Sequence, residues 1–260
     1  MEFSILDKAD SLVIAAVQFI LMLFFIFMGI KTSYYRKISI EDYESNSLLV
    51  TGIYTILGLL LAFSFGMAGN RFDSRKKDII EESNCIGTAI LRSDMYPDSI
   101  GALFREDFRK YLETRIEYFE AHTDIERMKR SIEGSDIFAE KLWKRASELS
   151  RNGEYLAVTN QMIPALNSMF DIANTRLHGE LYKLPNPIVI MLLISLLIAA
   201  FVFGYSSHAK GKVDWYLAYC FCLVSVLLLY FILDLDRPRR GLINLDDSQM
   251  AITNIRKMFK

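Results

Sequence analysis

LGLLLAFSFGMAGNRFDSRKKDIIEESNCIGTA, residues 57–89, passes from an uncharged apolar segment into a charged amphipathic one without meeting a proline. Its first part, Leu57–Gly69, contains only apolar and small side chains, and polar side chains begin at Asn70 and Arg71. Because a proline would break a helix and none is present, we predict one helix across this boundary. Such a helix would leave a membrane and continue directly into a soluble domain.

Four segments of the chain are apolar enough to span a membrane. Crossing the hydrocarbon core of a bilayer takes about 20 apolar residues in a helix. Residues 11–30, 48–69, 188–205 and 215–233 approach this length and contain no charged side chain. The first is interpreted as a retained helix, because its apolar run is longer than a signal-peptide core and acidic residues precede it. We therefore predict an all-α integral membrane protein with four transmembrane helices.

Residues 70–186, between the second and third spans, show helical periodicity. Capping residues, prolines and glycines divide them into four predicted helices. These are Arg71–Met95, Asp98–Ser131 with Asp98 as N-cap, Ser135–Arg151 with Ser135 as N-cap, and Glu154 to about Leu184, which Pro164 should kink. The predicted domains are an N-terminal membrane hairpin (1–69), a helical cytoplasmic domain (70–186), a C-terminal membrane hairpin (187–234) and a cytoplasmic tail (235–260).

The charge distribution predicts an orientation and excludes one class of partner. Lysine and arginine are more frequent at the span ends on the side of the membrane where residues 70–186 lie, including the N-terminal flank of the first span and the C-terminal flank of the fourth, than at the opposite ends. Lys31, Arg36 and Lys37 oppose this bias. By the positive-inside rule, both termini and the central domain are expected in the cytoplasm. Acidic and basic side chains nearly balance, with a formal net charge of −1, so no nucleic-acid partner is expected.

The second span is rich in small residues, which let helix backbones approach closely in a membrane. They are Thr51, Gly52, Thr55, Gly58, Ser64, Gly66, Ala68 and Gly69. One interpretation is packing within a single subunit. The other is a helix beside a symmetry axis, with a stripe of side chains forming a hydrophobic constriction of a pore. That stripe, repeating every four residues, is Thr55, Leu59, Phe63 and Met67.

Charged residues near the span ends leave selectivity and assembly open. Beyond the second span, two acids would favour cations and four bases would favour anions if they faced a pore axis. They are Glu81 and Glu82 against Arg71, Arg75, Lys76 and Lys77. The fourth span ends in Asp234, Asp236 and Arg237. These are either an interfacial charge cluster or a salt-bridged joint to the base of the second span, near Arg71 and Asp73.

Two separate segments carry a resemblance to a known family. They read Leu57-Gly58, Phe63, Asn70-Arg71-Phe72-Asp73-x-Arg75, Glu82-x-Asn84-x-Ile86-Gly87-Thr88-Ala89, and later Asp234-Leu235-Asp236-Arg237-Pro238-x-x-Gly241. In these residues, and in the order of two spans, a helical insert and two spans, the chain resembles bacterial membrane proteins with a bestrophin-like domain. The segment from Leu57 to Asn84 is also similar to true bestrophins. Phe72-Asp73 stands where they have paired aromatics, and no acidic calcium clasp is present, so calcium gating is not expected.

The resemblance implies an oligomeric ion channel in a bacterial inner membrane. True bestrophins are pentamers around an axis lined by the second span, which implies copies of the same chain, the lipid bilayer and small inorganic ions as partners. The implied neck falls on Thr55, Leu59 and Phe63, with Met67 one turn further along the same stripe. The residues expected at the cytoplasmic pore mouth or joint are Asn70, Arg71, Asp73, Glu82, Asp234, Asp236 and Arg237.

Other classes of function have weaker support. His122, His178 and His208 stand apart, and no catalytic, phosphate-binding or metal-binding motif is present, so no enzyme, cofactor or metal site is predicted. A secondary transporter is disfavoured because no span contains an acidic or basic side chain near its middle. A non-conducting scaffold or signalling protein remains the alternative to a channel. The apolar seam Leu156–Leu177 would then bind its partner.

Overall fold

The computed structural model describes residues 10–37, 40–209, 213–237, 239 and 241–259. Within these residues the chain is helical and has no strand. Its elements follow in the order α2 (Ser11–Arg36), α3 (Ile40–Ser93), α4 (Asp98–Glu120), α5 (Ile125–Leu149), α6 (Leu156–Leu181), α7 (Asn186–Ala209), α8 (Trp215–Leu235), α9 (Asp246–Asn254) and the short 3₁₀ helix η1 (Ile255–Phe259). Helices α2, α3, α7 and α8 are long and apolar enough to cross a membrane. The predicted fold class, an all-α chain with four membrane spans, is confirmed.

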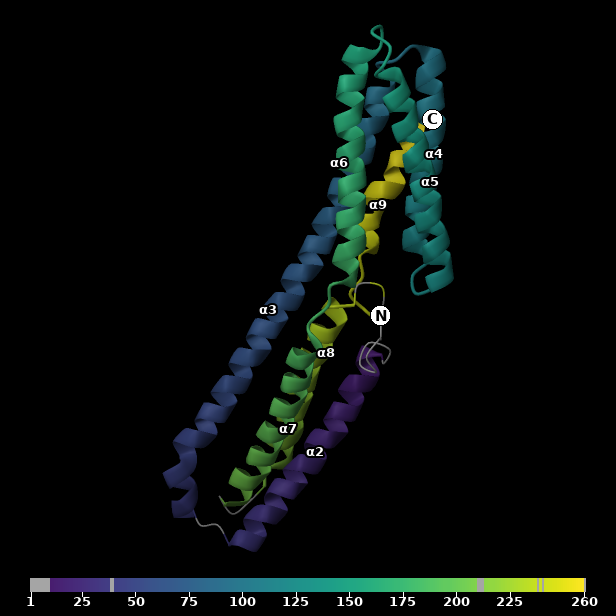
Figure 1. Ribbon diagram of the computed structural model, residues 1–260. Helices are drawn as coiled ribbons and strands as arrows, with labels where there is room; N and C mark the ends of the chain where they lie inside the picture. The colour runs from purple at the N-terminus through teal and green to yellow at the C-terminus, as the bar shows by residue number, and fades with distance from the viewer. Residues whose placement is uncertain (1–9, 38–39, 210–212, 238, 240, 260) are drawn as a thin grey trace. The chain divides into compact units, whose positions relative to one another are not determined.

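The chain forms two compact units. The membrane unit comprises the residues up to Arg71 together with Lys183–Arg237, and the second unit comprises Phe72–Tyr182 together with the residues after Arg237. Helix α3 belongs to both, because its 54 residues run without a break from Ile40 to Ser93 (Figure 1). The prediction of one helix that continues past Asn70 is therefore confirmed.

In the membrane unit, α2 lies along α7 and α8 (Figure 1). Two glycines make the contact between α2 and α7 possible. A Cβ atom on Gly29 would clash with the carbonyl oxygen of Phe201, and one on Gly204 would clash with that of Ile26. The buried Gln18 adds a polar link, since its Nε2 donates to the carbonyl oxygen of Leu193 at 3.1 Å. Close backbone approach and such hydrogen bonds are main sources of helix association in lipid.

In the second unit, α4 and α5 lie side by side and α6 packs against α5 (Figure 1). Their apolar faces, with part of α3, surround one core. Its large buried side chains include Ile86, Phe104, Phe108, Leu112, Leu142, Met162 and Leu166. The C-terminal segment, expected only as a tail, contributes Leu245, Ile252 and Ile255 to the same core. Residues after Arg237 are thus an integral part of the second unit.

The predicted helix Asp98–Ser131 is wrong, because α4 ends at Glu120 and α5 begins at Ile125. The N-cap of α5 is Asp124, whose side chain accepts a hydrogen bond from the Arg127 amide at 3.0 Å, and not Ser135. Gly134 does not end a helix but lies inside α5. A Cβ there would lie 3.0 Å from Cγ2 of Thr114, so glycine allows α4 and α5 to approach closely.

The start of α4 also differs from the prediction, whereas α6 contains Pro164 as predicted. The N-cap of α4 is Pro97, and no side chain caps this helix, so the prediction of Asp98 as N-cap is wrong. Helix α6 continues through Pro164, which lies exposed inside it. The most deeply buried apolar side chains of α6 are Met162, Leu166 and Met169, so most of them lie beside the predicted seam, whose first residue, Leu156, is exposed.

Candidate pore helix and buried charge cluster

One face of the apolar part of α3 is not covered by the rest of the membrane unit. Thr55, Leu59 and Phe63 all lie on this face, with Leu59 55% and Phe63 64% exposed. Met67, the fourth residue of the predicted stripe, is half-buried. The opposite face of α3 carries the buried residues Leu57, Leu61, Ser64 and Ala68. In this chain the predicted neck stripe therefore contacts little of its own subunit.

Four glycines in the apolar part of α3 are not used for packing within the described part of the chain, although Ser64 and Ala68 are buried. A Cβ atom built on Gly52, Gly58, Gly66 or Gly69 would meet no atom within 4 Å. This contrasts with Gly29 and Gly204, which are required by the contact between α2 and α7. Gly58, Ala62 and Gly66 recur every four residues on the exposed side. That spacing is the small-xxx-small pattern by which membrane helices bind each other.

An ion pair lies at the polar end of the membrane unit. Nη1 of Arg71 is 3.2 Å from Oδ1 of Asp236, and Oδ2 of Asp236 accepts a hydrogen bond from the Leu184 amide at 2.6 Å. Asp236 therefore connects α3, the segment before α7 and the end of α8. Asp234 is fully buried beside it in sequence, and Arg237 is half-buried. That this pair acts as a functional joint stays a prediction.

The remaining residues predicted for the pore mouth do not gather with this pair. Asn70 and Asp73 are exposed on α3. Glu82 is fully buried in the second unit, where Oε1 accepts from Nε of Arg115 and Oε2 from Nη1 of Arg176, both at 2.5 Å. A carboxylate held in this way does not line a pore.

Glu82 belongs to a buried charge network that we did not predict from the sequence. Its partners Arg115 and Arg176 lie 33 and 94 residues further along the chain, too far for a local pattern to reveal. Burial raises the pKa of Glu82, but the two guanidinium groups outweigh burial and hold the pKa below its ordinary value. One signal was present in the sequence: Glu82 lies three residues after Ile79 and four before Ile86, on the apolar face of α3.

The network extends to a second carboxylate, Glu180. Its Oε2 accepts from Nε of Arg239 at 2.7 Å and from the Tyr118 hydroxyl at 2.9 Å. Burial, with Glu180 beside it, raises the pKa of Tyr118 to about 12. We call the five residues Glu82, Arg115, Arg176, Glu180 and Arg239 the arginine cluster. They come from α3, α4, α6 and the segment between α8 and α9.

The structure separates the charges that the sequence left open. Arg75 is buried and donates to the carbonyl oxygens of Gly179 and Tyr182, at 3.3 and 2.6 Å, where it caps the end of α6. Arg71 and Glu82 are occupied by the contacts above. Of the six candidates, only Lys76, Lys77 and Glu81 are exposed.

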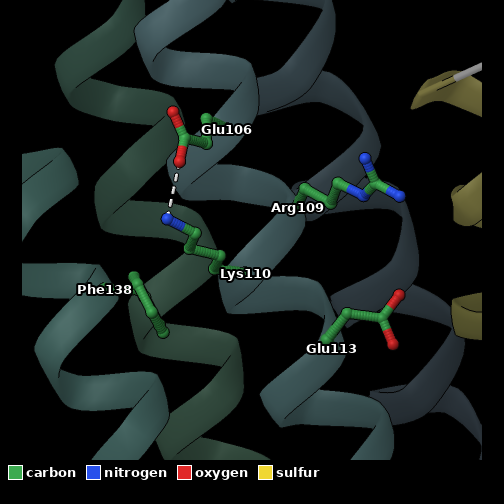
Figure 2. A pocket seen from close by; sticks show the side chains of 5 residues that line it. All are labelled: Glu106, Arg109, Lys110, Glu113 and Phe138. Atoms are coloured by element: carbon green, nitrogen blue, oxygen red, sulfur yellow. Dashed lines mark hydrogen bonds and ion pairs between the residues drawn. The ribbon is translucent and has the colours of Figure 1, made fainter.

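A pocket of about 560 Å³ opens on the surface of the second unit, between α4 and α5 (Figure 2). It is lined by Glu106, Arg109, Lys110, Glu113 and Phe138. Lys110 pairs with Glu106 at 2.6 Å (Figure 2), and Glu113 pairs with Arg256 at 2.5 Å. These are solvent-exposed ion pairs, which contribute little to the free energy of folding. In the described part of the chain, no group of three or more His, Cys, Asp or Glu side chains could hold a metal ion.

The fold resembles solved structures of a bacterial bestrophin homolog from Klebsiella pneumoniae. One of them is 11% identical in sequence, covers 94% of this chain and 98% of its own, and has a TM-score of 0.67. A single-residue variant of that homolog, also 11% identical, covers 96% of this chain and 98% of its own, with a TM-score of 0.69. A search of curated proteins gave no match. The sequence model that defines the Bestrophin-like domain family matches residues 13–250 of this chain. The chain therefore belongs to the Bestrophin-like domain family.

Proposed function

We propose that the chain assembles into a homo-oligomeric channel for passive conduction of small inorganic ions, with α3 beside the symmetry axis. The observation that carries this proposal is the unused face of α3, with its exposed Leu59 and Phe63 and its open glycines. Of the most apolar stretch of α3, only 17% is buried within the chain, against 33 to 39% for the other three spans. This span therefore needs contacts that the chain itself does not supply.

A neighbouring helix satisfies this face better than lipid does. Glycine and alanine present little surface to an acyl chain, whereas they let two helix backbones come close enough for extensive van der Waals contact. With copies of α3 meeting along Gly58, Ala62 and Gly66, the stripe of Thr55, Leu59 and Phe63 would turn toward the axis. A ring of Leu and Phe side chains would form a neck that gates by excluding water.

The finer features rest on the resemblance to bestrophins. It implies a pentamer, a bacterial inner membrane, and termini and second unit on the cytoplasmic side. At the end of the membrane unit, the Arg71–Asp236 pair would hold the fourth span against the base of the pore helix. Asn70 and the exposed Asp73 remain the candidates for the pore mouth.

Ion flux into liposomes containing the purified protein tests the proposed function. We expect Phe63→Ala and Leu59→Ala to raise flux severalfold, because each shortens a side chain that narrows the neck. Phe27→Ala is the matched control: Phe27 is a similarly exposed aromatic, 53% exposed, on α2. It should leave flux unchanged.

Two outcomes would overturn the channel. A monomer in mild detergent would exclude an axial pore. Absence of flux from the wild type and both neck variants, in a confirmed oligomer, would favour the scaffold instead.

A further inference from the structure

The arginine cluster contains more positive than negative charge. Three guanidinium groups, of Arg115, Arg176 and Arg239, face the two carboxylates of Glu82 and Glu180. All three lie around one aromatic ring, with their Cζ atoms 5.3, 5.9 and 4.4 Å from the centre of Tyr118. The cluster itself therefore has one positive charge in excess, and its surroundings add the buried Arg75 and three carboxylates that are half-buried or exposed to solvent, Asp78, Glu81 and Asp136. Burying an uncompensated charge is costly.

The hydrogen bonds of the cluster show the same imbalance. Nη2 of Arg115 and Nε2 of Gln249 are buried donors that have no hydrogen-bond partner among the residues that the structure describes. The side chains that carry them are only 3% and 5% exposed. Nε of Arg176 and Nη2 of Arg239 also lack a hydrogen bond, but each lies near an oxygen of Glu180, at 3.6 and 2.6 Å. Of these four buried donor atoms, only Nη2 of Arg115 and Nε2 of Gln249 therefore lack both a hydrogen bond and an ion pair with a described residue.

Both unpartnered donors belong to the hydrogen-bond network around Glu82, to which Arg115 is joined directly and Gln249 through Arg176. In an arginine, Nε and Nη2 occupy the same edge of the guanidinium plane, so Nη2 of Arg115 is directed to the side on which Nε donates to Glu82. Oε1 of Gln249 accepts from Nη2 of Arg176 at 3.1 Å, and Nη1 of the same arginine donates to the other oxygen of Glu82. The contacts Arg115–Glu82–Arg176–Gln249 thus form a chain with an open donor at each end.

We propose that the arginine cluster binds one small monovalent anion of halide size, held by Nη2 of Arg115 and Nε2 of Gln249. The anion would close the chain of contacts into a ring and balance the excess positive charge. It would also fasten α9, which carries Gln249, to α4 and α3. The site lies wholly within the second unit and is independent of the proposed pore.

An anion fits these donors better than a water molecule does. Water supplies acceptor lone pairs but must also place two protons on acceptors of its own. Here both oxygens of Glu82 and Oε1 of Gln249 already accept from arginines, so a water molecule would have to share these acceptors with charged donors. Water also leaves the excess charge uncompensated. A halide accepts several hydrogen bonds, donates none and carries the missing negative charge.

Thermal unfolding of the purified protein in sodium chloride and in sodium gluconate of equal ionic strength tests the site. Gluconate is too bulky to enter a buried halide site, so we expect the unfolding midpoint to rise with the logarithm of chloride concentration. For a dissociation constant of about 30 mM, about 300 mM chloride would shift the unfolding equilibrium roughly tenfold. Crystals grown in bromide should give an anomalous peak beside Arg115 and Gln249.

Two variants separate this site from a general salt effect. Gln249→Glu tethers a carboxylate where the anion would lie, so its midpoint in gluconate should exceed that of the wild type and should not respond to chloride. Arg256→Gln, the control on the neighbouring η1, breaks only an exposed pair with Glu113 and should keep the chloride response. Equal midpoints of the wild type in both salts, an equal chloride response in all three proteins, or water density without an anomalous peak would each overturn the proposal.

Discussion

At the residue scale, the buried charge of Glu82 sets a dependence of stability on acid. The folded state holds the pKa of Glu82 below its ordinary value of 4.5, because Arg115 and Arg176 outweigh the effect of burial. A carboxyl whose pKa is depressed on folding contributes stability that is fully present above its unfolded pKa. That contribution is lost as the pH falls through the folded pKa. Part of the acid unfolding of the second unit should therefore come from this single group.

We predict that Glu82→Gln lowers the free energy of unfolding by about 3–5 kcal/mol at neutral pH, because two buried guanidinium groups lose their shared carboxylate. Melting curves followed by circular dichroism, from neutral pH down to about pH 3, measure both this loss and a flatter acid dependence. Glu81→Gln is the matched control, because Glu81 lies next to Glu82 in the sequence but is exposed. Its replacement should change the free energy of unfolding by no more than about 0.5 kcal/mol. Equal melting of Glu82→Gln and the wild type at every pH would contradict the network.

At the element scale, the contact between α2 and α7 depends on two glycines whose importance cannot be deduced from composition. The small residues of the second span are conspicuous in the sequence, and those of the first and third are not. Yet Gly29 and Gly204 are the ones that the chain uses for close helix contact, because a Cβ atom at either position would clash with the backbone of the other helix. A partner helix far away in the sequence decides which glycine is needed, and a single sequence does not name that partner.

We expect Gly204→Ala to destabilise the membrane unit by about 1–3 kcal/mol, because the new methyl group must push the α2 backbone away. The midpoint of thermal unfolding in detergent measures this loss. Gly153→Ala serves as the control, because a Cβ there meets no atom within 4 Å and the turn is exposed. A Gly204→Ala protein as stable as Gly153→Ala would show that the helices can separate without loss.

The sequence predicts long elements well and their boundaries less well, for a physical reason. Uncharged runs of spanning length define the four membrane helices directly, and the absence of proline defines the continuity of α3. The break between α4 and α5 was missed because it contains neither proline nor glycine: Asp124 ends the turn by capping α5. Gly134 misled the prediction because glycine also serves close packing. Of the candidate site, the stripe could be deduced from periodicity, but the arginine cluster depends on distant contacts.

At the scale of the whole molecule, the chain leaves part of its apolar surface without a partner. The exposed side chains of α2, α7 and α8 are mostly large and apolar, as suits contact with lipid. Those of α3 mix Leu59 and Phe63 with glycine and alanine, a composition that suits contact with another helix. An assembly of copies would cover the small residues and enclose the large ones. The proposed function requires such an assembly, and the small residues indicate the surface on which we propose it to form.

We therefore predict that Gly58→Leu, and likewise Gly66→Leu, reduces the purified protein to smaller species in mild detergent while its helix content stays unchanged. A leucine at either position would separate the backbones of neighbouring α3 helices, at a cost of about 1–3 kcal/mol per interface. Both positions are exposed within the chain, and the added Cβ atom meets open space, so folding should be preserved. Light scattering after size exclusion measures the mass, and circular dichroism the helix content.

Ala16→Leu makes the same small-to-large change on the exposed side of α2, and it should leave the mass unchanged. The comparison matters because any added leucine on a membrane helix alters detergent binding. If both glycine variants kept the wild-type mass, the open glycines of α3 would face lipid, and the pore axis would have to lie elsewhere. If they lost the oligomer and the flux together, with Ala16→Leu unaffected, assembly along α3 and conduction would be one property of the same surface.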